Sequence, residues 1–174
     1  MSTRTFTVGL ISDTHGLLRP EAVHALRGSD FIIHAGDIGD PTVLDELSRL
    51  APVTAIRGNN DKGAWASALP ETEVLNVGAT SVFVIHNLAE IAVDPTVAGF
   101  HVVVSGHSHR PTYRMERGVL FVNPGSAGPR RFKLPVAAGR LLIAGTQVTP
   151  RLFELQATGV TVGERGDLGR HVGV

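Results

Sequence analysis

Five polar blocks in the sequence place side chains that can bind metal ions next to glycine or at the end of an apolar run. In chain order they are Asp13-Thr14-His15, Gly36-Asp37, Gly58-Asn59, His86 and Gly106-His107-Ser108-His109. The chain has no cysteine, which excludes disulfides, thiolate zinc sites and cysteine nucleophiles. Any metal bound by these blocks must therefore sit on oxygen and imidazole nitrogen.

The spacing within two blocks indicates that their side chains converge. Because a strand alternates its side chains, the two members of Asp13-x-His15 point the same way, as do those of His107-x-His109. The neighbouring glycines let the backbone bend sharply and approach other segments closely. Candidate ligands from separate loops can thus meet at one place.

Apolar runs precede the blocks and predict the strands that position them. Strands are expected over residues 5–12, 31–34, 53–56, 81–85 and 101–104. A helix is expected over 20–27, and another from Pro41 with Val43, Leu44, Leu47 and Leu50 at helical spacing. Ligand sites in α/β proteins lie at the carboxyl ends of strands, which is where the polar blocks fall.

The second half of the chain reads as further strands, over 74–77, 113–116, 119–122, 140–144 and 148–155. Two of these pairs look like hairpins, so this half is expected to be antiparallel or mixed. The predicted fold is α/β, with two mixed β-sheets face to face and flanked by helices in a four-layer α/β/β/α sandwich. One domain is expected over 1–155, followed by a tail over 156–174.

Composition restricts the class of protein. The 174 residues are 43% hydrophobic and 18% charged, which is ordinary for a packed domain. Sixteen basic residues balance sixteen acidic ones, so we expect no stable nucleic-acid complex. No apolar stretch approaches the length of a spanning helix and the start lacks a signal-peptide pattern, so we expect a cytoplasmic protein that does not enter a membrane. Apolar strands make a homodimer or homotetramer plausible.

The blocks, in the order D-x-H, GD, GN, H and GHxH, resemble the signature of the calcineurin-like metallophosphoesterase superfamily. The resemblance spans roughly residues 8–126. Arg57-Gly58-Asn59, Asn123-Pro124-Gly125-Ser126 and the short chain look like the small bacterial and archaeal phosphodiesterase branch, to which the retromer subunit Vps29 is similar in fold. The resemblance implies that the substrate is a small phosphate ester.

The resemblance also implies a pair of metal sites. Asp13, His15, Asp37 and His109 would hold one divalent ion, and Asp37, Asn59, His86 and His107 the other. A hydroxide bridging the two ions would attack a phosphodiester, with Asp37, Asn59 and Asn60 as the catalytic residues. Mixed oxygen and imidazole ligation favours manganese as the metal, with iron, zinc, cobalt or nickel as alternatives.

Two positions depart from the family pattern. Asn60 stands where many members have a histidine, and an amide cannot donate a proton at neutral pH. This favours esters with good leaving groups, and a diesterase within the small branch. Asn87 replaces a glycine after His86 and is expected to narrow the approach to the second metal.

Several residues and functions stay open. Arg57, Arg130, Arg131 and Lys133 would contact substrate phosphate or lie in solvent. His34 would orient a metal-binding carboxylate or pack in the core, and Asp40 would cap a turn. The alternative functions are a phosphomonoesterase on the same site and a non-catalytic interaction protein like the retromer subunit.

Overall fold

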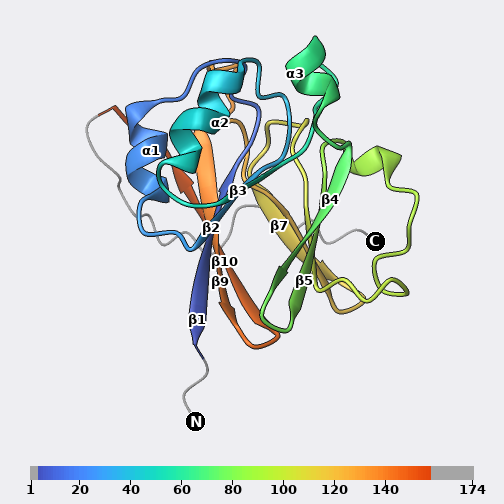
Figure 1. The fold of residues 1–174 in the computed structure, drawn as a ribbon. Coiled ribbons are helices and arrows are strands. Elements are labelled where there is room, and N and C mark those ends of the chain that lie inside the picture. Colours follow the sequence, from blue (N-terminus) through green and yellow to red (C-terminus); the bar gives the residue numbers. More distant parts are fainter. Residues whose placement is uncertain (1–3, 158–174) are drawn as a thin grey trace.

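The computed structural model describes residues 4–157, which form two mixed five-stranded sheets packed face to face (Figure 1). The first sheet, in the order β10-β9-β1-β2-β3, contains β1 (Thr5–Ile11), β2 (Phe31–His34), β3 (Val53–Ala55), β9 (Ala137–Ala144) and β10 (Gln147–Glu154). The second, in the order β4-β5-β6-β8-β7, contains β4 (Thr72–Val77), β5 (Thr80–Ile85), β6 (Val102–Val104), β7 (Thr112–Glu116) and β8 (Val119–Asn123). The predicted two-sheet sandwich is confirmed.

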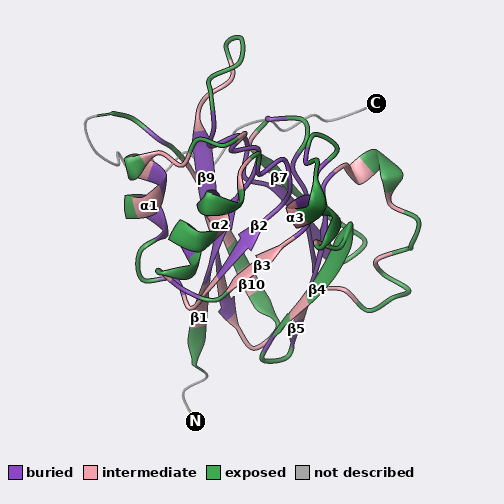
Figure 2. Cartoon of the chain, turned by 45° about the horizontal axis from the view of Figure 1, so that its top comes forward, coloured by how far each residue is buried: buried purple, intermediate pink, exposed green. Residues whose placement is uncertain are grey.

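Alternating apolar side chains fill the space between the sheets. Val8 and Leu10 of β1 point inward and pack in one buried cluster with Val82 and Val84 of β5. Gly9, between them, faces the other way, toward Leu26 and the helices. In Figure 2, β2 and β9 are buried, whereas β4 is largely exposed at the edge of its sheet. Each fully buried side chain of this size contributes about 1.5–3 kcal/mol, so the core fixes how the sheets pack.

Two helices cover the outer face of the first sheet. Helix α1 (Pro20–Leu26) and helix α2 (Pro41–Ser48) both begin with proline, whose fixed φ suits the first helical turn. Leu26 and Leu47 are buried in one cluster with residues of β1 and β2. The Asp40 carboxylate accepts a 2.8 Å hydrogen bond from the Thr42 N–H, which confirms the predicted cap.

The outer face of the second sheet is covered differently. Residues 88–100, with the short 3₁₀ helix η1 (Leu88–Glu90), place Leu88, Ile91 and Phe100 against buried side chains of β5, β6 and β8. A further short helix, α3 (Ala64–Ser67), follows the Gly58-Asn59 block. Neither short helix was predicted, because one turn shows no apolar periodicity.

For the other predicted strands and helices, most ends lie within one to three residues of the ends in the structure. Helix α2 ends at Ser48, so Leu50 lies beyond it. The pairs β7–β8 and β9–β10 are antiparallel, which confirms both hairpins. The predicted tail beyond residue 157 lies outside the described residues. Within the described part of the chain, no helix is long and apolar enough to cross a membrane.

Candidate metal centre

The predicted ligands gather at one end of the sandwich, where strands of both sheets end. Strands β1, β2 and β3 run parallel, as do β5 and β6, so their carboxyl ends lie at the same edge of each sheet. Each of these five strands is followed by one of the polar blocks. The expected placement of the blocks at strand ends is confirmed.

Hydrogen bonds tie these loops to one another. The Asp13 N–H donates to the Gly36 carbonyl at 3.0 Å, which joins the first two loops. The Asn123 amide donates to the Gly106 carbonyl at 2.7 Å, and the Ser126 hydroxyl donates to the Asp13 carbonyl at 3.0 Å. Residues 123–126, at the carboxyl end of β8, therefore lie beside the ligand loops. Ser126 is buried and serves to position the loop.

Backbone geometry corrects one step of the sequence argument. The ligands of Asp13-x-His15 and His107-x-His109 do not converge by strand alternation, because β1 ends at Ile11 and β6 at Val104. Instead the backbone is left-handed at five candidate ligands: Asp13 (φ 55°), His15 (φ 47°), Asp37 (φ 53°), His107 (φ 66°) and His109 (φ 58°). Such strain costs on the order of 1–3 kcal/mol per residue and clusters at functional sites.

Two glycines make room for the carboxylates. A Cβ at Gly58 would collide with the backbone nitrogen and Oδ1 of Asp37. A Cβ at Gly106 would collide with the Ser12 hydroxyl and lie 2.8 Å from Asp13 Oδ2. Both glycines are therefore required by close packing around the acidic side chains.

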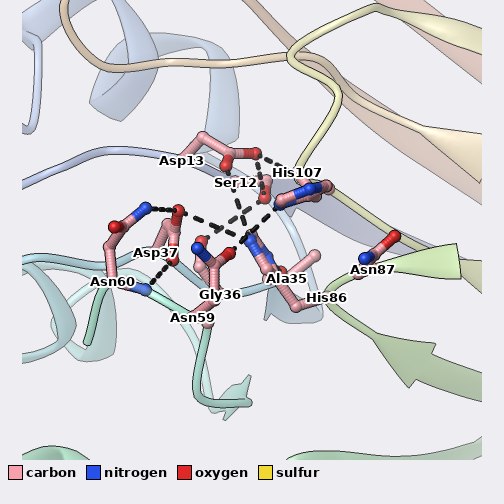
Figure 3. A network of polar contacts seen from close by, with 12 residues as sticks. Ser12, Asp13, Ala35, Gly36, Asp37, Asn59, Asn60, His86, Asn87 and His107 are labelled. Carbon is pink, nitrogen blue, oxygen red and sulfur yellow. Dashed lines mark hydrogen bonds and ion pairs between the residues drawn. The ribbon is translucent and has the colours of Figure 1, made fainter. Parts of the chain in front are cut away.

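All seven candidate ligands lie within one connected group (Figure 3 shows part of it). His109 Nε2 lies 3.2 Å from Asp13 Oδ1, and His86 Nε2 lies 3.4 Å from Asp37 Oδ2 and 4.0 Å from Asp13 Oδ1. His15 Nε2 lies 3.9 Å from Asp37 Oδ2. The His86 and His107 rings are 5.2 Å apart between centroids.

Two asparagines complete the group. Asn59 Oδ1 lies 3.1 Å from His107 Nδ1, at the exposed side of the site. Asn60 is bonded to both oxygens of Asp37, through its backbone N–H at 2.9 Å and its side-chain amide at 2.7 Å. Asn60 thus positions the Asp37 carboxylate.

Unpaired polar atoms show that this arrangement fits a bound cation. Among the described residues, Asp13 Oδ1, His15 Nε2 and His86 Nε2 are buried without a hydrogen-bond partner. His86 Nδ1–H donates to the Ala35 carbonyl at 2.7 Å, so Nε2 is the ring nitrogen that faces the carboxylates. Two sets of ligand atoms each lie within 4.8 Å of one another: Asp13, His15 and His109; and Asp13, Asp37 and His86. Which metal each residue binds stays a prediction.

Electrostatics supports the same conclusion. Burial works against a charged Asp37, but the neighbouring His86 imidazole and the hydrogen bonds from Asn60 hold its pKa well below its usual range. Burial also disfavours a charged His86, yet the Asp37 carboxylate and the Ala35 carbonyl raise the pKa of this imidazole. Burial lowers the pKa of His15. The site thus concentrates negative charge and attracts positive charge, as a metal centre does.

His34 lies directly behind the ligand loops and is completely buried. Its Nδ1 accepts the Gly36 N–H at 3.2 Å, and its Nε2 lies 2.9 Å from the Thr14 hydroxyl. That hydroxyl donates to the Ile38 carbonyl at 2.8 Å, so Nε2 must carry the proton and donate to it. A neutral His34 therefore links the two loops that present Asp13 and Asp37.

Acid is expected to destabilise the protein through His34. Burial lowers the pKa of His34 from 6.5 to about 4 in the folded state. The unfolded chain therefore binds a proton first, and the stability from neutral His34 is lost as pH falls from about 6.5 to 4, by up to about 3 kcal/mol. Urea unfolding of metal-free protein at pH 7 and 4.5 measures this. The His34→Gln variant should lose less stability over that interval, and an equal loss in both proteins would refute the assignment.

The Asp61 carboxylate joins the loop that follows β2 to the loop that follows β3. One carboxylate oxygen accepts the N–H of Ile38 at 3.2 Å and of Gly58 at 2.8 Å, and the other accepts that of Gly39 at 2.8 Å. Ser12, which donates to Asp13 Oδ2 at 2.7 Å, was missed because a serine before Asp-x-His carries no distinctive signal.

Not all of the basic residues predicted to contact substrate phosphate lie near the candidate metal ligands. Arg57 lies near Asn59 but pairs with Glu71 at 2.6 Å. Arg131 is close enough to His15 for its charge to contribute to the lowered pKa of that imidazole. Arg130 and Lys133 are exposed and make no hydrogen bond or ion pair with the candidate ligands among the described residues. Substrate contact by these residues stays a prediction.

Comparisons with known proteins agree with the geometry. The sequence model of the calcineurin-like phosphoesterase superfamily domain matches residues 6–144. A Methanothermobacter thermautotrophicus relative named as a probable metallophosphoesterase is 34% identical over 131 residues, 68% of this chain and 76% of its own. A Methanocaldococcus jannaschii protein named phosphodiesterase is 26% identical over 137 residues, 68% and 82% of the two chains. A crystal structure of an Entamoeba histolytica Vps29 variant has the same fold, with a TM-score of 0.74, 22% identity and coverage of 89% and 96%.

Proposed function

The chain belongs to the calcineurin-like phosphoesterase superfamily, and on that premise we propose that it is a metal-dependent phosphodiesterase acting on a small substrate. The observation that carries the proposal is the group of Asp13, Asp37, His15 and His86, in which Asp13 Oδ1, His15 Nε2 and His86 Nε2 are buried without hydrogen-bond partners. In the overall reaction the oxygen of water bonds to phosphorus, one phosphorus–oxygen ester bond breaks, and the departing alcohol takes up a proton.

We propose that Asp13, His15, Asp37 and His109 hold one divalent ion and that Asp37, Asn59, His86 and His107 hold the other. Two such ions would activate water and neutralise the charge that develops on the phosphate oxygens. Manganese is the proposed metal because oxygen and imidazole ligands suit it, with iron, zinc, cobalt or nickel as alternatives. The relative named phosphodiesterase supports the proposed substrate class.

The chain's own residues favour a diester with a good leaving group. Asn60 donates its amide to Asp37 and has no acidic proton to give to a departing alkoxide. A monoester carries an extra negative charge near neutral pH, and the additional cations that would bind it are either paired, as Arg57 is with Glu71, or exposed. We keep the phosphomonoesterase as the rival on the same site.

Two nitrophenyl esters separate these functions. With Mn²⁺, hydrolysis of bis(p-nitrophenyl) phosphate is expected to exceed that of p-nitrophenyl phosphate and to stop after chelation with EDTA. Faster turnover of the monoester would make the protein a phosphomonoesterase. If neither ester is cleaved with any of the five metals, an interaction protein similar to Vps29 becomes the better proposal.

The remaining proposals concern location and assembly. We propose a cytoplasmic enzyme with no stable nucleic-acid complex, because the chain has no cysteine and its charges balance. A homodimer or homotetramer stays a proposal that sedimentation can check.

A further inference from the structure

A polar recess opens directly beside the candidate metal centre. It is bounded by residues 57–72 on one side and 85–90 on the other, and both Asn59 and His86 line it. Its volume is about 580 Å³, within the range of small-molecule sites. A phosphate held at His86 and Asn59 would therefore have one ester group inside this recess.

Most of the residues that line the recess carry side chains that can form hydrogen bonds. Arg57 and Glu71 form an ion pair at 2.6 Å, and the Asn87 amide donates to Glu90 at 3.2 Å. Lys62 adds an ammonium group. Apart from glycine, Ile85 is the one apolar residue among the described residues that line the recess, and they include no phenylalanine, tyrosine or tryptophan.

This lining disfavours several kinds of ester group. A nucleobase is usually held by stacking on an aromatic side chain, and a quaternary ammonium group by a cage of aromatic rings, and the recess offers neither. A second phosphate would meet the carboxylates of Glu71 and Glu90. An alkyl chain would remove these charged groups from water without replacing their hydrogen bonds.

A hydroxylated group fits because each hydroxyl both donates and accepts. The Glu90 carboxylate can accept from one hydroxyl while the Lys62 ammonium donates to another. We infer that this recess binds a neutral polyol group, such as glycerol or a sugar alcohol, on one side of the scissile phosphate. The inference rests on the proposed phosphodiesterase function and names the substrate class that the site accepts.

Asn87 separates this recess from a second, smaller one. The second recess has a volume of about 170 Å³ and is lined by Leu88, Phe121 and Arg114. Asn87 lines both, and its side chain is fixed by accepting the Ala89 N–H at 3.1 Å. The two ester groups of a diester would thus meet different surroundings, because Leu88 and Phe121 line only the second recess.

A matched pair of substrates tests the inference. Glyceryl p-nitrophenyl phosphate and propyl p-nitrophenyl phosphate share the leaving group and differ in the two hydroxyls, and the product is identified as glycerol phosphate to exclude cyclisation. With Mn²⁺, kcat/KM for the glyceryl ester is expected to be about tenfold higher, the size of one or two net hydrogen bonds. The Glu90→Gln variant should reduce this ratio several-fold, whereas Glu46→Gln, on the exposed face of α2, should leave it unchanged.

The outcomes distinguish the two proposals. Suppose that the enzyme cleaves bis(p-nitrophenyl) phosphate. The polyol assignment is then overturned, and the phosphodiesterase proposal stands, if the glyceryl and propyl esters have nearly equal kcat/KM. The same holds if thymidine 5′-(p-nitrophenyl phosphate) has a higher kcat/KM than the glyceryl ester. A wild-type preference that Glu90→Gln retains in full removes this recess as its cause. Failure to cleave any diester overturns the proposed function itself.

Discussion

Replacing Asp37 with asparagine is expected to lower kcat/KM for bis(p-nitrophenyl) phosphate by on the order of 10³-fold or more. The Asp37 carboxylate is buried and lies 3.4 Å from His86 Nε2 and 3.9 Å from His15 Nε2, so it faces both proposed metal positions. Asparagine keeps the size of the side chain but removes the negative charge that would be shared between two cations. Steady-state kinetics and the manganese content of the purified variant measure the effect.

The matched control is Asp45→Asn, on the exposed surface of helix α2. This variant removes the same charge far from the ligands and should keep wild-type activity and metal content. If Asp37→Asn bound manganese and hydrolysed the diester as well as Asp45→Asn does, the buried carboxylate would have no part in metal binding.

The second large effect is expected from adding one methyl group at Gly58. A Cβ there would collide with the nitrogen and Oδ1 of Asp37, and Oδ1 cannot move without disturbing its hydrogen bond from the Asn60 N–H. Overpacking of this kind costs about 1–3 kcal/mol of stability. Displacement of the carboxylate should also weaken manganese binding by about 10–100-fold. Calorimetric titration with Mn²⁺ and thermal unfolding measure the two effects separately.

Gly9→Ala separates lost stability from lost metal binding. A Cβ at Gly9 would lie 2.7 Å from Leu26 and 2.8 Å from the Ser29 hydroxyl, in the packing between β1 and helix α1. This variant should therefore unfold at a lower temperature and bind manganese normally once folded. Equal weakening of manganese binding in both variants would mean that Gly58 acts through general stability.

Much of the fold follows from apolar patterning. Alternation at Val8 and Leu10, and helical spacing at Val43 and Leu47, each place apolar side chains on one face that must be buried. The sandwich was therefore predictable, and the parallel strands explain why the polar blocks meet. The short helices α3 and η1 were not, because tertiary contacts rather than sequence periodicity support single turns.

The residues of the site could be predicted from the sequence, but the backbone conformation that presents them could not. Left-handed geometry at Asp13 and His107 has no local sequence signal, since it persists only where surrounding contacts hold it. The roles of Ser12, His34 and Asp61 depend on hydrogen bonds to loops far away in sequence. Asn60 shows the same limit, because its identity indicated a missing acid while its contact with Asp37 required the structure.

Anomalous diffraction from crystals grown with Mn²⁺ tests most directly whether the ligand loops form a two-metal centre. Two manganese peaks are expected, one beside Asp13, His15 and His109 and one beside Asp37 and His86. Peaks only elsewhere on the chain, or no peak at saturating Mn²⁺, would contradict the proposed centre and the hydrolase that depends on it.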